Sequence, residues 1–190
     1  MVADDLVGDI VTEAENKMKK AIEVLKKDLT GVRTGRANPA LVDRLSVEYY
    51  GVPTPLNQLA NVSAPEPQLL VIQPWDKSMI GPIEKAILKS ELGLTPTNDG
   101  RVIRLAIPRL SEERRRELVK VVRRRAEEGK VAVRNCRREG VEDLKELEKE
   151  KMISEDEMKR GQERVQKLTD AYIEEVDRVA ASKEKEILEV

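Results

Sequence analysis

All nine prolines of this 190-residue chain fall in one central segment, between Pro39 and Pro108. Residues 1–38 and 109–190 contain none. Proline lacks a backbone N–H and breaks the interior of a helix, so long helices can form in the two flanks and not between them. The chain is therefore predicted to have two helical flanks that enclose a mixed module.

Apolar residues in both flanks recur at steps of three and four, which is the period of an amphipathic helix. In the first flank they are Leu6, Ile10, Ala14, Met18, Ala21, Ile22, Leu25 and Leu29. The second flank predicts one helix from Ser111 to about residue 150 and another that opens at Ser154, which has capping-box spacing to Glu157. Such helices can bury their apolar faces only against one another, which predicts a three-helix bundle.

The central segment has the patterns of short strands and one helix. Residues 44–49 and 101–107 alternate in polarity, and residues 68–72 form a short apolar run. Residues 80–88 have helical spacing. The stretch 51–67 is irregular and is expected to be either a contact loop or a connector. These patterns predict a small β/α/β module.

We therefore predict an α+β fold with two domains. Residues 1–33 and 109–190 would form the long three-helix bundle, and residues 34–108 the small β/α/β domain inserted after the first helix. The chain would cross between them twice, near residues 32–38 and 106–110. Two such crossings can bend as a hinge, and they also restrain the motion.

The composition excludes most enzyme chemistry. The chain has no His and a single Cys, so it can build neither a His-based catalytic triad nor a zinc site of its own. It has no glycine-rich phosphate loop of the Walker or dinucleotide type. No apolar run approaches the ~20 residues of a membrane span, and the acidic N-terminus does not have the order of a secretory signal. We expect a cytoplasmic protein that is not an enzyme, with no metal site, no cofactor and no membrane contact.

Basic residues concentrate between Arg109 and Arg138, with twelve bases against five acids in a chain of net charge −1. Ten of the twelve are arginines, whereas lysines outnumber arginines fifteen to eight elsewhere. A guanidinium is a flat fork of donors that fits a phosphate by two-point contact. The segment is predicted to bind RNA or DNA backbone by shape, because it holds no aromatic residue on which bases could stack.

Helical periodicity places six of these bases on one face, with Arg137 at its border. They are Arg116, Lys120, Arg123, Lys130, Arg134 and Arg138. The alternative is an ordinary solvated face, paired with acids of the neighbouring helices. A helical adaptor that docks an acidic protein partner is the alternative function. Cys136 is expected to pack in the core, and Tyr49, Tyr50 and Trp75 to be core or surface residues rather than a ligand cage.

Several short sequence motifs resemble those of the bacterial ribosome recycling factors, also called ribosome-releasing factors. The motifs occur in the same order as in the family and extend over almost the whole chain: RTGRANP at 33–39, EYYG at 48–51, TPLNQLA at 54–60, IEKAI at 83–87 and KVAVRNCRR at 130–138. The chain is identified by them as a member of that family. The triplet Arg123-Arg124-Arg125 is richer in charge than is typical.

The resemblance implies an L-shaped molecule, with a three-helix bundle and an inserted β/α/β domain. It implies a non-enzymatic factor that works with elongation factor G and GTP to split the post-termination ribosome into subunits. The bundle would bind the large ribosomal subunit and its rRNA through arginines that match Arg115, Arg134 and Arg137, with Arg138 adjacent. The protein is expected to be a monomer.

The resemblance also implies a hinge and the part of the molecule that moves. The hinge residues would be Arg33, Thr34, Gly35 and Arg36 on one crossing, and Ala106, Ile107, Pro108 and Arg109 on the other. Elongation factor G would act upon the small domain.

Overall fold

The computed structural model describes residues 2–189, with side chains described from Leu6 onward. The chain divides into two compact units, one made by the residues up to Val32 together with Glu113–Leu188, and the other by Arg33–Glu112. The first unit is helical and the second contains the strands, so the predicted α+β class is confirmed. No helix among the described residues is long and apolar enough to cross a membrane.

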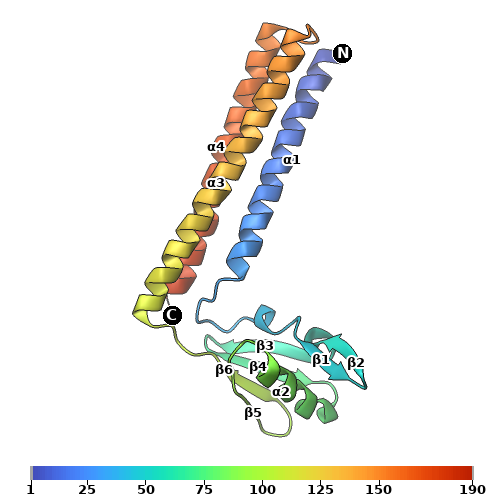
Figure 1. The fold of residues 1–190 in the computed structure, drawn as a ribbon, viewed down its shortest axis with the longest axis vertical. Coiled ribbons are helices and arrows are strands. Elements are labelled where there is room, and N and C mark those ends of the chain that lie inside the picture. Colours follow the sequence, from blue (N-terminus) through green and yellow to red (C-terminus); the bar gives the residue numbers. More distant parts are fainter. Residues whose placement is uncertain (1, 190) are drawn as a thin grey trace. The chain divides into compact units, whose positions relative to one another are not determined.

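The helical unit consists of α1 (Val2–Thr30), α3 (Glu112–Lys149) and α4 (Glu155–Leu188). Figure 1 shows the three helices side by side, with α1 and α4 running in one direction and α3 against them. The start of α4 has the predicted capping box. Ser154 Oγ accepts from the backbone N–H of Glu157 at 3.1 Å, and Glu157 Oε2 accepts from the N–H of Ser154 at 2.7 Å.

The buried face of α1 differs from the predicted one at its start. Val7 and Val11 are buried, whereas Leu6 and Ile10 are half-buried. All four are apolar and lie next to one another in pairs, so periodicity alone does not locate the centre of this wide apolar arc. Val7 and Val11 continue the line of Ala14 and Met18, so the stripe is centred on them, and Leu6 and Ile10 lie at its edge.

Glycines bring the three helices together in successive layers of the core. A Cβ added at Gly129 would meet Leu25 of α1 and Val176 of α4, and one added at Gly140 would meet Ala14 and Val165. Gly161 on α4 faces Leu144 of α3 and Val7 of α1 even more closely. Each layer thus takes one residue from each helix, and the glycine fills the position with the least room.

The second unit is built on a four-stranded antiparallel sheet of order β3-β4-β6-β5. The strands are β3 (Ala60–Glu66), β4 (Leu69–Pro74), β5 (Pro96–Asn98) and β6 (Ile103–Ala106). The helix α2 (Ile80–Lys89) buries Ile83 and Ile87 in the same core as Leu70, Ile72, Ile103 and Leu105. Short 3₁₀ turns cover Pro39–Leu41, Leu56–Gln58 and Lys77–Met79.

A separate hairpin is formed by β1 (Ser46–Tyr49) and β2 (Val52–Pro55). Tyr49 is paired with Val52, so the loop is the two residues Tyr50 and Gly51. Their φ angles of 46° and 82° are both positive, as the commonest two-residue hairpin turn requires.

The stretch 51–67 was expected to be irregular, and this expectation was wrong because it contains all of β2 and all of β3. Prolines suggested a loop. Both strands tolerate them for the same reason: β2 pairs only with β1, and β3 lies at an edge of its sheet. Pro65 falls where the register with β4 shifts, between Ser63 and Glu66.

Candidate nucleic-acid interface

The helix α3 carries the arginine-rich segment on the side away from the bundle core. Its buried residues are Leu118, Val119, Val122, Ala126, Val133, Gly140 and Leu144. Cys136 is half-buried beside them, and burial raises the pKa of its thiol. The core face fixes how the helix is turned, so it also determines which bases point to solvent and which point toward α4.

Two members of the predicted basic face are paired with α4. Arg123 Nε donates to Glu184 Oε1 at 2.9 Å, and Lys130 Nζ lies 2.7 Å from Asp177 Oδ1. These carboxylates raise the pKa of Arg123 and of Lys130. For these two residues the alternative of a solvated face paired with neighbouring acids is the correct one.

Four other bases have a different environment. Lys120, Arg124, Arg134 and Arg138 are exposed, and within the part of the chain that the structure describes none of them has an acid within the 4.0 Å of an ion pair. We call these four residues the unpaired row. The structure therefore brings Arg134 and Arg138 together with two bases that the family resemblance does not single out.

Arg137, which helical spacing puts at the border of the basic face, lies beside α4. It is half-buried, and its Nη1 donates to Gln166 Oε1 of α4 at 3.4 Å. A groove of about 570 Å³ opens beside it, lined by the bases Arg137, Arg138, Lys145 and Lys159 and one acid, Glu163. Lys159 is held by Glu155 at 2.8 Å. The excess of bases suits the groove to an anion.

Arg115 is far from the other matched arginines. It is half-buried near the start of α3. Nineteen residues separate it from Arg134, which is ~28 Å along a helix at ~1.5 Å per residue. The matched arginines thus form one group of three and one distant single residue.

The two predicted crossings meet closely at one point. Gly35 has a φ of 73°, and a Cβ at this position would lie 3.2 Å from Leu110 Cγ. Arg33 is exposed, and Thr34 and Arg36 are half-buried. On the second crossing, Ala106 is the last residue of β6, Ile107 is buried in the core of the second unit, and Pro108 is exposed. Arg109 Nε donates to Gln68 Oε1 at 3.2 Å.

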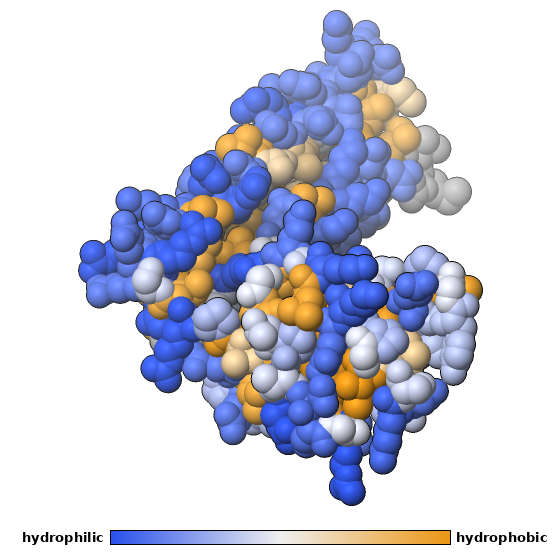
Figure 2. Space-filling view, turned by 60° about the horizontal axis from the view of Figure 1, so that its bottom comes forward, coloured by the Kyte–Doolittle hydropathy of each residue, from blue (hydrophilic) through white to orange (hydrophobic). Residues whose placement is uncertain are grey.

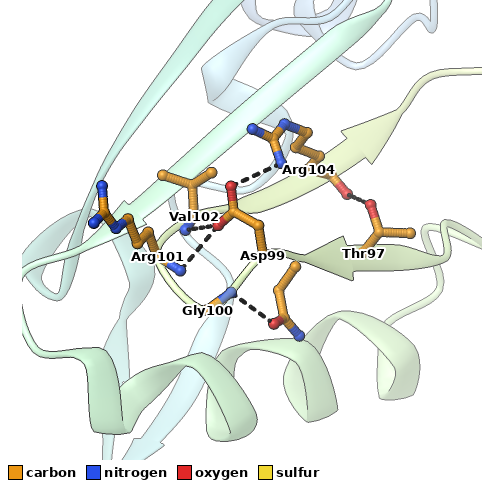
Figure 3. A network of polar contacts seen from close by, with 7 residues as sticks. Thr97, Asp99, Gly100, Arg101, Val102 and Arg104 are labelled. Carbon is orange, nitrogen blue, oxygen red and sulfur yellow. Dashed lines mark hydrogen bonds and ion pairs between the residues drawn. The ribbon is translucent and has the colours of Figure 1, made fainter.

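Asp99, whose carboxylate pKa is strongly lowered, lies in the turn between β5 and β6, which Figure 3 shows from close by. Asp99 Oδ1 accepts from the backbone N–H groups of Val102 and Arg101, each at 2.9 Å. Asp99 Oδ2 accepts from Arg104 at 3.1 Å. These bonds lower the pKa of Asp99 to about 2. The acceptor bonds hold a tight turn, so the shift has a structural cause.

The aromatic residues that the sequence singled out lie at the surface of the second unit. Tyr50 is 78% exposed and Trp75 is 68% exposed, so both are surface residues. Tyr49 packs edge to face against Tyr50, with ring centroids 4.6 Å apart. In the view of Figure 2, apolar residues lie in separate patches among polar ones. No group of three His, Cys, Asp or Glu residues in the described part of the chain could hold a metal ion.

The helical bundle, the antiparallel module inserted into its sequence and the basic face of α3 place this chain among the two-unit α+β proteins that carry a basic helical face. A model of the family described as ribosome recycling factor matches residues 25–188. The ribosome-recycling factor of Heliobacterium modesticaldum is 63% identical over 185 residues, which are 97% of this chain and 100% of that protein. The one of Carboxydothermus hydrogenoformans is 62% identical over the same shares. This chain belongs to the ribosome recycling factor family.

Solved structures agree with this assignment. A solution structure of the ribosome recycling factor is 52% identical, covers 97% of this chain and 98% of its own, and has a TM-score of 0.77. A second is described as the T. thermophilus ribosome recycling factor and the E. coli elongation factor G bound to the E. coli post-termination complex. It is 52% identical, covers 96% of this chain and 98% of its own, and has a TM-score of 0.65.

Proposed function

We propose that this protein acts with elongation factor G and GTP to dissociate the post-termination ribosome into subunits. Membership of the family supports the proposal, and the related T. thermophilus factor is described on the post-termination complex together with elongation factor G. The observation that carries it here is the set of exposed arginines in the unpaired row of α3, Arg124, Arg134 and Arg138, which have no described acid within the 4.0 Å of an ion pair.

In this proposal α3 anchors the protein on rRNA of the large subunit. The contacts come from Arg115, Arg134, Arg137 and Arg138. Guanidinium groups bind phosphates with two parallel hydrogen bonds, which fixes orientation as well as adding affinity. The 38 residues of α3 form one continuous helix of ~57 Å, so the anchor residues have fixed spacings along it.

The second unit is the part on which elongation factor G acts. Its two connections to the bundle, at Arg33–Arg36 and at Ala106–Arg109, would serve as the hinge. Gly35 lies where the two connections approach each other: its φ is positive, and an added Cβ would lie 3.2 Å from Leu110 Cγ, so a side chain there would be strained. The protein itself catalyses no reaction in this scheme. It works in the cytoplasm as a monomer, and GTP hydrolysis belongs to elongation factor G.

The anchor is tested by reversing the charge of Arg134 and Arg137 together. We expect binding to purified large subunits to be lost at moderate salt, while the helix content and the melting temperature stay close to wild type. The control reverses Lys20 and Lys27, two exposed lysines of α1, and makes the same change in net charge. The proposed anchor would be contradicted if the arginine variant bound large subunits as well as the wild type, or if the lysine variant lost as much binding as the arginine variant.

The whole function is tested by subunit splitting. Wild-type protein, elongation factor G and GTP are added to purified post-termination complexes, and subunits are followed by light scattering. We expect splitting that requires all three components and that the arginine variant does not support. A protein that binds a cellular protein after nuclease treatment, and never co-sediments with ribosomes, would instead be the helical adaptor.

A further inference from the structure

We propose that Lys120 and Arg124 are additional phosphate-contacting residues, and that they extend the RNA-binding face of α3 toward its first half. This inference rests on the proposed function and adds residues to its anchor. It is carried by the charges and ion pairs of α3, because the family resemblance covers Arg115, Arg134 and Arg137 and leaves these two bases aside.

The four bases of the unpaired row share one side of α3. At ~100° per residue, Lys120, Arg124, Arg134 and Arg138 fall within an arc of ~80°. Val122 and Val133, which are fully buried, lie on the opposite side. From Lys120 to Arg138 the row is ~27 Å long. A straight run of this length can follow a nucleic-acid backbone past several phosphates.

The acids nearest to Lys120 and Arg124 form their ion pairs with bases outside the row. These pairs are Glu117 with Arg114 at 2.8 Å, Glu128 with Arg125 at 3.2 Å, and Glu127 with Lys130 at 3.6 Å. Among the described residues, neither Lys120 nor Arg124 therefore has an ion-pair partner on its own helix. Glu127 lies within the arc of the row, between Arg124 and Arg134, and its partner Lys130 also binds Asp177 at 2.7 Å. Glu113 and Glu142 lie on the same side of α3 at the two ends of the row.

Arg123 and Arg124 are neighbours in the sequence and carry the same charge, but their environments differ. The guanidinium of Arg123 is bound to Glu184 of α4, whose side chain is only 22% exposed. A phosphate that contacted Arg123 would have to displace this carboxylate. Arg124 points one helical step further from α4 and is open to solvent. The two residues therefore form a matched pair for an experiment.

The test compares Arg124→Gln with Arg123→Gln in binding to purified large ribosomal subunits. The monovalent salt is varied at fixed Mg²⁺, and log affinity is plotted against log salt concentration. Each phosphate contact contributes a slope of ~0.7–0.9. We expect Arg124→Gln to lose one such increment, which is a ~5- to 8-fold weaker affinity at about 0.1 M salt. Arg124→Lys is expected to keep the slope.

Arg123→Gln is expected to keep the wild-type slope and to melt at a slightly lower temperature, because Glu184 loses its partner. Equal losses of slope in both variants would overturn the inference, since any positive charge on α3 would then serve. An unchanged slope in Arg124→Gln would overturn it too and would leave the anchor at Arg134 and Arg137. A wild-type protein that fails to bind large subunits would overturn the proposed function as well.

Discussion

Gly161 occupies the tightest position in the core of the bundle. A Cβ at this residue would lie 3.0 Å from both Cδ atoms of Leu144 and 3.0 Å from Cγ1 of Val7. Favourable carbon contacts have separations of ~3.5–4.0 Å. The substitution Gly161→Ala therefore requires two buried side chains, on two different helices, to move by ~0.5 Å or more. Both are locked in the same layer, so neither can turn away freely.

The size of the effect follows from two opposing terms. Alanine in a helix interior is favoured over glycine by ~1 kcal/mol. Overpacking a well-packed core costs ~1–3 kcal/mol. Because three methyl groups are too close at once, we expect the second term to exceed the first, with a net loss of ~1 kcal/mol. For a chain of this size that lowers the melting temperature by ~2–4 °C.

Gly140 and Gly129 provide the controls. The nearest atom to an added Cβ is 3.4 Å away at Gly140, and 3.3 Å away at Gly129. Gly140→Ala should keep most of the helical gain and stabilise the protein, and Gly129→Ala should fall between the other two. Urea unfolding followed by far-UV circular dichroism measures all three. If Gly161→Ala stabilised the protein as much as Gly140→Ala, the steric argument would be refuted.

A double variant identifies the cause of the loss. Val7→Ala removes one of the three methyl groups that crowd Gly161. If steric crowding is responsible, Val7→Ala should cost less in the Gly161→Ala background than in the wild type. Strict additivity of the two changes in unfolding free energy would show that the crowding does not act through Val7.

Two further predictions concern polar groups. Ser154→Ala removes the acceptor for the N–H of Glu157 and should lower the free energy of unfolding by ~0.5–2 kcal/mol in urea titrations, whereas Ser154→Asp should retain most of it. Asp99 should titrate by NMR with a pKa of about 2, well below its ordinary 3.8. Because its pKa is depressed in the folded state, the stability it adds is present above pH 3.8 and is lost as the pH falls toward 2, so Asp99→Asn should differ from wild type at neutral pH and match it near pH 2. A pKa of Asp99 near 3.8 would contradict the turn geometry.

The placement of proline was a sound guide to the long helices and a poor guide to the strands. A proline inside a long helix would break it, so the three helices had to lie in the flanks. A strand at the edge of a sheet has one side without a partner and can hold proline there. Pro53 and Pro55 in β2 therefore looked like loop residues, although they belong to a hairpin. Whether a strand lies at an edge depends on the topology of the sheet, which local pattern does not contain.

Local sequence predicted the start of α4 because both partners of the capping box are three residues apart. Ser154 and Glu157 can form their two hydrogen bonds whatever the rest of the chain does. The core face at the start of α1, by contrast, is not determined by local sequence. Leu6, Val7, Ile10 and Val11 are all apolar, and the choice among them is made by where α3 and α4 lie. That choice needs tertiary structure.

The same limit applies to the charges of α3, where it bears on function. Periodicity put Arg123 and Lys130 on the binding face together with Arg134, because all are separated by helical steps. The pairing acids Glu184 and Asp177 lie more than 45 residues further along the chain. Which bases they neutralise depends on how α3 and α4 are turned toward each other. Two of the basic charges are used to hold α4, and it is the bases turned away from that helix that can attract a phosphate. Affinity for RNA should therefore follow the bases of the unpaired row together with the other proposed anchor residues Arg115 and Arg137, and not the total positive charge of the segment.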